Sequence, residues 1–241
     1  MKKRVRLLFT CLFVVCLLME LWGQFSNTLW INIFTKPLLM PLLAIVMAAS
    51  LQNHTLGIFR NSLILIGLFF SWLGDVFLML VDLKPDFFLA GLSAFLITHI
   101  LYSVAFYNIG RTHALCWNLT TFSTTIIIFI SAIILLLLLW PKLGAMRIPV
   151  LVYSCCISVM AVLSLWIWLK YKSFFSSLLL LGALLFMLSD SLIAINRFHT
   201  TFDGAGFWIM LTYGLAQLFI VSGFIRFANS TVYRAKQELV E

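Results

Sequence analysis

Charged residues are scarce in this chain. Only 10% of its 241 residues are charged, whereas 63% are hydrophobic, and the mean hydropathy is +1.10. A soluble globular domain usually carries about 25% charged residues, so the composition excludes an ordinary soluble fold. The polar segments between the apolar runs are too short to hold a soluble domain. We therefore expect residues 1–241 to form a single membrane-embedded domain of a polytopic membrane protein.

Common catalytic and metal-binding signatures are also missing. The five cysteines fall almost entirely within apolar runs, and no CxxC or His/Cys ligand spacing occurs, so neither a disulfide nor a metal site is predicted. The chain has no GxSxG nucleophile elbow and no P-loop or dinucleotide-binding fingerprint. His54, His113 and His199 lie in or near expected loops, which disfavours a membrane zinc hydrolase with several histidine ligands.

Long continuous apolar runs dominate the sequence instead. A helix needs about 20 residues to cross the hydrocarbon region, whereas a β-barrel would show alternating segments of about ten residues. The runs are rich in Leu, Ile and Phe, and they predict an all-α bundle of eight transmembrane helices. The expected spans are 7–23, 36–52, 58–81, 87–108, 118–140, 149–169, 174–196 and 204–227.

The first run follows a basic start, as a signal peptide does. It is long and lacks a small-residue cleavage site, so we interpret it as the first membrane helix. Glu20 lies near the expected outer end of this helix. We expect its side chain to reach the membrane interface.

Positive charge is distributed unevenly between the connecting segments. If the N-terminus is on the inner side, the inner segments hold 11 of the 16 Lys and Arg residues. The outer segments then hold the other five, which are Lys36, Lys84, Lys142, Arg147 and Arg197. Because cytoplasmic loops are enriched in Lys and Arg, we expect both termini in the cytoplasm. The net charge of +8 then reflects topology and contact with membrane lipids, and no basic stripe predicts binding of nucleic acid.

Two aspartates interrupt the apolar runs. Asp75 lies in LFFSWLGDVFLML and Asp190 in GALLFMLSDSLIA. A carboxylate at membrane depth costs several kcal/mol, so it normally marks a functional site with a polar partner. At a rise of 1.5 Å per residue, both aspartates lie about 9 Å below the outer ends of their spans. One shared site is favoured over two separate packing anchors, because a histidine and tyrosines lie at neighbouring depths.

Further polar residues recur at helical spacing in the same spans. Stripes of small and polar residues indicate the helix faces that pack against other helices. The candidates on such stripes are Ser71, His99, Tyr102, Ser189, Tyr213 and Gln217. We expect them to line a pocket that opens from the outer half of the bilayer. Lys36, expected to begin the second span at the outer edge, would cap this pocket.

The paired carboxyls predict acid–base chemistry. Two carboxyl groups close together in a low-dielectric site do not both ionise at neutral pH, so one supplies an acid and the other a base for hydrolysis. We therefore expect Asp75 and Asp190 to be catalytic, and the other candidates to position substrate or water. Intramembrane aspartyl proteases also pair two aspartates. Their GxGD and YD elements are absent, since Trp72 stands two residues before Gly74 and Ser189 precedes Asp190.

Five segments together resemble the YhhN-type lysoplasmalogenase family. They are KPLLMPLL at 36–43, GLFFSWLGDVFLM at 67–79, GLSAFLITHILY at 91–102, GALLFMLSDSLIAINRF at 182–198 and YGLAQLFI at 213–220. The combination of GD, HxxY, SDxxxA and YxxAQ is specific as a set, and it runs in order over most of the chain.

The resemblance implies hydrolysis of the vinyl ether bond of lysoplasmalogens. The products would be a fatty aldehyde and glycerophosphoethanolamine or glycerophosphocholine, and no metal or organic cofactor is implied. Vinyl ethers are cleaved by protonation of the β-carbon and capture of the resulting oxocarbenium ion by water, a problem that glycosidases solve with two carboxyls. The single chain of the substrate would enter between helices while the headgroup stays at the interface, where Lys36 would meet the phosphate.

A different class of function is also compatible with buried aspartates. A proton-coupled transporter or binding protein for lipids or small solutes would use them as proton-coupling sites. The chain shows no pair of broken helices in corresponding halves, which many transporters have, so the enzyme is favoured. In either case we expect a multi-pass protein of the bacterial inner, or cell, membrane.

Overall fold

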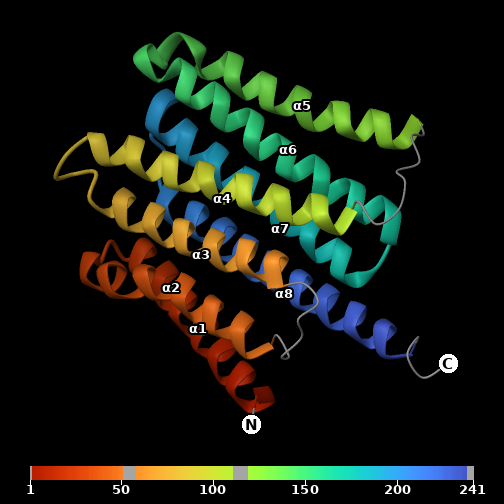
Figure 1. The fold of residues 1–241 in the computed structure, drawn as a ribbon. Helices are drawn as coiled ribbons and strands as arrows, with labels where there is room; N and C mark the ends of the chain where they lie inside the picture. Colours follow the sequence, from red (N-terminus) through yellow and green to blue (C-terminus); the bar gives the residue numbers. More distant parts are fainter. Residues whose placement is uncertain (1, 51–57, 111–118, 238–241) are drawn as a thin grey trace.

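The computed structural model describes residues 2–50, 58–110 and 119–237, and this part of the chain is helical without any strand (Figure 1). The long helices are α1 (Lys2–Phe25), α2 (Leu29–Ser50), α3 (Ile58–Met79), α4 (Asp86–Gly110), α5 (Leu119–Leu139), α6 (Arg147–Tyr171), α7 (Phe174–Ala194) and α8 (Ala205–Gln237). Three short helical segments follow α5 and α7, namely the 3₁₀ turns η1 (Trp140–Lys142) and η2 (Gly144–Met146) and the π-helical turn η3 (Ile195–His199).

Eight helices of the described chain are long and apolar enough to cross a membrane. The prediction of a multi-pass integral membrane protein with eight spans is thereby confirmed. Consecutive helices run in opposite directions, so both termini lie at one end of the bundle (Figure 1). The opposite end, which we call the distal end, carries residues 26–28, 80–85, 140–146 and 195–204. It corresponds to the side that the charge bias predicts to be outside.

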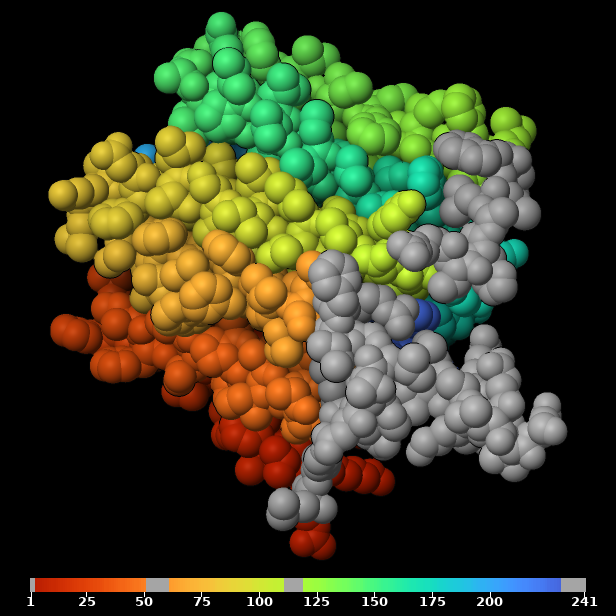
Figure 2. All heavy atoms as spheres, in the orientation of Figure 1, coloured from red at the N-terminus to blue at the C-terminus, as the bar shows by residue number. Residues whose placement is uncertain are grey.

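Seven of the helices form a closed ring. Following the contacts around the ring, α1 packs on α2, α2 on α3, α3 on α4, α4 on α6, α6 on α7, α7 on α8, and α8 returns to α1. The remaining long helix, α5, packs on the outside of α6 and lies apart at the edge of the bundle (Figure 1). In the space-filling view, α3 and α4 fill the front face between α1 and α2 on one side and α5 and α6 on the other (Figure 2).

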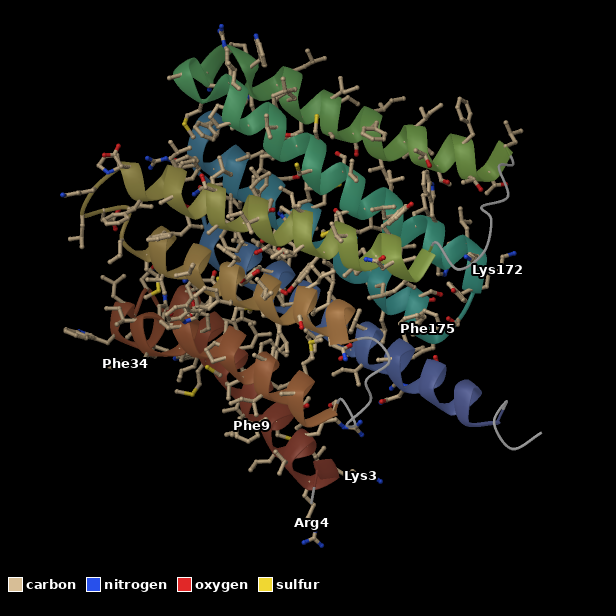
Figure 3. The ribbon with its side chains drawn as sticks, in the orientation of Figure 1. Lys3, Arg4, Phe9, Phe34, Lys172 and Phe175 are labelled. Atoms are coloured by element: carbon tan, nitrogen blue, oxygen red, sulfur yellow. The ribbon has the colours of Figure 1, made fainter. Side chains whose placement is uncertain are left out.

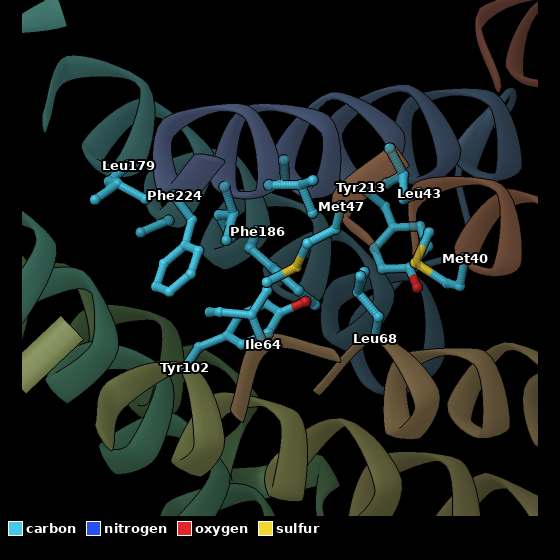
Figure 4. Packing of buried hydrophobic residues seen from close by; sticks show 14 of the residues in the cluster. Met40, Leu43, Met47, Ile64, Leu68, Tyr102, Leu179, Phe186, Tyr213 and Phe224 are labelled. Atoms are coloured by element: carbon cyan, nitrogen blue, oxygen red, sulfur yellow. The ribbon is translucent and has the colours of Figure 1, made fainter. Parts of the chain in front are cut away.

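The composition of α5 suits its peripheral place. Its buried residues are only Thr121, Ile128 and Leu139, and most of its Ile and Leu side chains are exposed. Lipid tails are as apolar as these side chains, so exposure to the bilayer costs a helix of this kind nothing. The ring helices instead bury one continuous apolar cluster, in which Phe186 and Leu68 lie near Tyr102 and Tyr213 (Figure 4).

Basic side chains mark the end of the bundle that holds the termini. Lys3 and Arg4 lie at the start of α1, and Lys172 lies at the turn between α6 and α7 (Figure 3). Phe34 instead extends from α2 away from the bundle, with 69% of its surface exposed (Figure 3). Cations at one end and exposed aromatic or aliphatic side chains along the flanks are the surface that a bilayer requires.

The second span begins earlier than predicted, which corrects the expectation for Lys36. Helix α2 starts at Leu29 rather than at residue 36, so Lys36 lies about 10 Å along the helix from its start at 1.5 Å per residue. Pro37 and Pro41 are both inside the helix. Pro41 has no N–H to donate to the Pro37 carbonyl, and Trp72 Nε1 of α3 donates to that carbonyl at 3.0 Å instead. The second span therefore continues through both prolines.

Other boundaries differ at the chain ends. Helix α1 begins at Lys2 rather than at residue 7, and α8 continues to Gln237 rather than ending at 227. Both extensions carry basic residues and lie at the end of the bundle where helices leave the apolar region. The predicted end of the second span at residue 52 and the predicted start of the fifth at 118 lie outside the described residues.

Candidate active site

Asp190 lies near the end of α7 and joins three helices through one carboxyl oxygen. Its Oδ2 accepts a hydrogen bond from Tyr153 of α6 at 2.5 Å and lies 2.9 Å from His99 Nε2 of α4. Tyr153 Oη is also 2.9 Å from His99 Nε2. His99 is fully buried, whereas 9% of the Asp190 side chain is exposed. We call Asp190, His99 and Tyr153 the Asp190 cluster.

The two oxygens of Asp190 have different surroundings. Oδ2 holds both polar contacts, whereas Oδ1 makes no hydrogen bond within the part of the chain that the structure describes. An ionised carboxylate only accepts hydrogen bonds, so His99 then carries its proton on Nε2. His99 Nδ1 is buried and has no partner among the described residues. The cluster therefore anchors one oxygen firmly and leaves the other available.

Asp75 of α3 belongs to a second cluster, which is more deeply buried. Its Oδ2 accepts a hydrogen bond from Tyr213 of α8 at 2.7 Å, and Asp75 is only 2% exposed. One turn away, Gln217 Nε2 donates to Ser71 Oγ at 2.9 Å, and Tyr102 Oη donates to Gln217 Oε1 at 2.8 Å. These five residues, which we call the Asp75 cluster, connect α3, α4 and α8 through polar side chains.

Two glycines of α3 allow α4 to approach this cluster closely. A Cβ at Gly67 would lie 2.3 Å from the Tyr102 ring, and a Cβ at Gly74 would lie 2.7 Å from the Phe95 ring. Glycine at these positions therefore admits two aromatic rings directly against the α3 backbone. Small residues have this role in many membrane helix interfaces.

The aromatic rings of Phe95 and Phe186 lie between the two clusters and contact residues of both. The Phe186 ring centroid is 4.6 Å from that of His99 and 5.5 Å from that of Tyr213, both in edge-to-face geometry. The Phe95 ring contacts Tyr213 at 5.8 Å and Phe186 at 6.2 Å. In the described residues the two carboxyls share no hydrogen bond, although they lie within electrostatic range of each other. The expected shared site is thus divided into two halves by Phe95 and Phe186.

An apolar cavity lies beside the Asp190 cluster. It is partly open and lies between α3, α4, α5, α6 and α7. Asp190 and Tyr153 are in its wall, and Phe95 closes the side that faces Tyr213. Nearly all other wall residues are Leu, Ile, Val, Ala, Met or Phe. An apolar lining with a few polar groups at one place is typical of a ligand site for an apolar molecule.

The structure places the remaining predicted residues around the clusters rather than in the cavity. Ser189 Oγ donates to the Ile209 carbonyl of α8 at 3.1 Å, so it joins two helices and contacts neither carboxyl. Lys36 is half-buried and within electrostatic range of Asp75, but it forms no ion pair among the described residues. Lys36 does not line the cavity beside Asp190.

Two residues at the site were not predicted from the sequence. Tyr153 was missed, although a tyrosine hydroxyl inside an apolar run is a signal that it needs a polar partner. Glu20 was predicted to reach the interface, and that prediction is wrong, since Glu20 is fully buried. It accepts hydrogen bonds from Thr35 of α2 at 2.5 Å and from Gln24 at 2.9 Å. The early start of α2 places Thr35 against α1, which makes this burial possible.

The polar side chains of the Asp190 cluster are suited to proton transfer. Within the described residues no group of three or more His, Cys, Asp or Glu side chains is placed to hold a metal ion. The Asp190 cluster combines a carboxyl with an imidazole and a phenol, and it borders an apolar cavity. Such a group can hold, donate and recover a proton next to a bound apolar molecule.

Sequence comparisons give the family of the chain. The model described as the YhhN family matches residues 31–224, a range that contains every residue of both clusters. The chain belongs to the YhhN family. This finding confirms the resemblance seen in the sequence motifs. No solved structure matches the chain.

Curated relatives come from bacteria and mammals. A Mycobacterium bovis protein named Lysoplasmalogenase is 28% identical over 191 residues, covering 78% of this chain and 70% of the relative. Proteins named Lysoplasmalogenase TMEM86A from Bos taurus and Homo sapiens are each 30% identical, over 219 and 215 residues. Both of these matches cover 85% of this chain and 82% of the relative.

Proposed function

We propose that this YhhN-family protein is a membrane hydrolase that cleaves the vinyl ether bond of lysoplasmalogens. The observation that carries the proposal is the carboxyl of Asp190 in the wall of an apolar cavity, held by His99 and Tyr153 through one oxygen. The names of the relatives support the same substrate. The released products are a fatty aldehyde and a glycerophosphoethanolamine or glycerophosphocholine.

In the proposed first step Asp190 is the acid. Its Oδ1 faces the bound lipid and transfers a proton to the β-carbon of the vinyl ether, which leaves an oxocarbenium ion at the α-carbon. The carboxylate that forms on Asp190 is stabilised by the hydrogen bonds of Tyr153 and His99 to Oδ2. Donors that strengthen as negative charge develops lower the barrier of a step of this kind.

Asp75 is the proposed base for the second step. It lies beyond Phe95 and outside the cavity wall, so this step requires the Phe95 ring to turn and admit one water between Asp75 and the bound lipid. Water adds to the α-carbon and gives its proton to the Asp75 carboxylate, which yields a neutral hemiacetal. The hemiacetal then collapses: its hydroxyl proton goes to Asp190, the bond between the α-carbon and the glycerol oxygen breaks, and Asp75 protonates the departing oxygen. Both aspartates return to their starting states, and the net reaction consumes one water. The residues of the Asp75 cluster, with Ser189 and Lys36 beside it, would keep Asp75 and the water in place.

The test compares aspartate variants of the purified protein on an alkenyl lysophospholipid and on its acyl counterpart, with free aldehyde as the readout. Asp190→Asn and Asp75→Asn should each lower kcat by about 10²- to 10⁴-fold, the usual contribution of general acid–base catalysis. Asp82→Asn is the control, because Asp82 is an exposed distal carboxyl that does not line the cavity and that the proposed steps do not use. Its kcat should stay near the unmodified value.

Two results would overturn the proposal. One is a protein that moves lysolipid into proteoliposomes without ever releasing aldehyde, which would favour a proton-coupled transporter. The other is near-normal aldehyde release by either aspartate variant, which would reject the paired-carboxyl mechanism.

A further inference from the structure

The cavity beside Asp190 extends towards the distal end, where Arg197 lies next to its wall. Phe88 of α4 and Phe198 of η3 are in the wall at this end and meet edge to face at 5.6 Å. The guanidinium of Arg197 lies over the Phe88 ring, 5.1 Å from its centroid. A cation stacked on an aromatic ring is held in place by the ring. Its N–H donors then remain available to bind a ligand.

Arg197 has no competing partner. Its side chain is exposed, and no carboxylate forms an ion pair with it within residues 2–50, 58–110 and 119–230. The acidic residues Asp82, Asp86 and Asp203 also lie at the distal end, and none of them approaches it within the 4.0 Å of an ion pair. Its five N–H donors in a planar fork match the oxygens of a phosphate.

Two further cations lie on the segments next to η3. Lys142 of η1 donates to the His199 carbonyl at 2.7 Å, which places its ammonium at the end of η3. Arg147, the first residue of α6, stacks over Trp140 at 5.2 Å. Leu139, Leu143 and Val150 beside them pack against Phe198, so the basic segment and η3 lie together. Three cations therefore lie at the distal end beside the apolar cavity.

The spacing between Arg197 and Asp190 fits a single-chain glycerophospholipid. The two residues are seven positions apart, about two turns of helix, and Arg197 lies in the π-helical turn that follows α7. Seven bonds separate the phosphorus of a lysoplasmalogen from the β-carbon of its vinyl ether. Three backbone bonds span 3.8 Å, so seven such bonds extend over roughly 9 Å. A phosphate held by Arg197 therefore allows the β-carbon to reach Asp190 when the glycerol part of the lipid runs along α7.

The backbone at Arg197 is also unusual. Residues Ile195–His199 form a π-helical turn after the regular part of α7. Turns of this type are rare and occur frequently at functional sites. Here the wider turn carries Arg197 and Phe198 together beside the cavity.

We propose that Arg197, flanked by Lys142 and Arg147, is the phosphate-binding subsite for the lipid whose chain occupies the cavity. The inference rests on the proposed function and replaces Lys36 as the residue that meets the headgroup. Lys36 lies on α2 beside the Asp75 cluster, whereas the cavity is bounded by α3 to α7. The subsite recognises the phosphate that ethanolamine and choline lysolipids share.

The experiment measures Arg197→Gln on two substrates, an alkenyl lysophosphoethanolamine and the corresponding 1-O-alkenylglycerol, which lacks the phosphate. On the phospholipid, kcat/KM should fall by roughly 10- to 100-fold, as expected for loss of a hydrogen bond to a charged group, with the change mainly in KM. On the alkenylglycerol the variant should match the unmodified protein. Arg197→Lys should recover part of the loss, because it keeps the charge without the planar fork.

Two lysine variants serve as controls. Lys84→Gln removes an exposed distal cation that does not line the cavity, and it should behave as the unmodified protein on both substrates. Lys36→Gln tests the earlier candidate for the phosphate. A phosphate-selective loss in Lys36→Gln but not in Arg197→Gln, an equal loss of Arg197→Gln on both substrates, or no loss at all would each overturn the subsite.

A binding measurement separates this inference from the hydrolysis mechanism. The non-hydrolysable 1-O-alkyl lysophosphoethanolamine and 1-O-alkylglycerol are titrated into the detergent-solubilised protein, and binding is followed by thermal shift. Arg197→Gln should weaken binding of the phospholipid about 10-fold or more and leave alkylglycerol binding unchanged. If no variant or substrate gives aldehyde but this difference is found, the proposed reaction fails and the subsite stands. If aldehyde is formed and the difference in binding is absent, the proposed reaction stands and the subsite is rejected.

Discussion

Removing the Tyr153 hydroxyl tests the role of the Asp190 cluster directly. The Tyr153→Phe variant keeps the ring, which meets His99 edge to face at 5.1 Å. It loses the hydroxyl, which donates to Asp190 Oδ2 at 2.5 Å and lies 2.9 Å from His99 Nε2. Hydrogen bonds to charged groups contribute about 1.5–3 kcal/mol. In the proposed mechanism the Asp190 charge exists only after the proton has left, so this bond is strongest in the transition state. At 1.36 kcal/mol per factor of ten, kcat should fall by roughly 10- to 150-fold.

The assay is aldehyde release by purified protein at saturating substrate, with Tyr171→Phe as the matched control. Tyr171 is on the same helix and its hydroxyl donates to the backbone carbonyl of Ile109, far from the cavity, so this variant should keep its kcat. Tyr153 acts through Asp190, so adding Tyr153→Phe to Asp190→Asn should cause little further loss. Unchanged kcat in Tyr153→Phe, or full additivity with Asp190→Asn, would refute the reasoning.

Three further predictions follow from the packing. Ala132→Trp puts a large ring into the cavity wall on α5; kcat/KM should fall more for long than for short alkenyl chains, and an equal loss at every chain length would contradict a chain-binding cavity. Gly67→Ala forces a Cβ against the Tyr102 ring and should lower the free energy of unfolding by about 1–3 kcal/mol, measured by thermal unfolding. Gly110→Ala is its control and should leave the stability unchanged, because the nearest atom to a Cβ there is 4.0 Å away. Trp72→Phe removes the donor to the Pro37 carbonyl and should lower the free energy of unfolding by about 1–3 kcal/mol; an unchanged unfolding temperature would mean that this carbonyl needs no partner.

The helical architecture was readable from composition and length. Apolar runs of about 20 residues have only two stable solutions in a bilayer, and their continuity selects helices. Asp75 and Asp190 were also recognisable in the sequence, because an acidic group within such a run is costly without a partner. The motifs around them matched one family, and the comparisons confirm that family.

Local signals misplaced the start of α2 and the environment of Glu20. Proline suits the first turn of a helix, and a glutamate near a helix end normally reaches water. Both expectations failed because a neighbouring helix supplies a hydrogen-bond donor. Trp72 donates to the Pro37 carbonyl, and Thr35 donates to the Glu20 carboxylate. These partners are 35 and 15 residues away in the chain, so no local pattern reveals them.

The pairing of polar groups inside the bundle depended on three-dimensional packing alone. Spacing along a helix places a residue at a depth and on a face, but it does not say which other helix that face meets. The ring order of the helices brings Tyr153 to Asp190 and Tyr213 to Asp75, and it inserts Phe95 and Phe186 between the two carboxyls. The sequence therefore showed that Asp75 and Asp190 must be buried, because both lie within apolar runs. Their partners, and the cavity beside Asp190, arise from contacts between runs, and these exist only in the folded bundle.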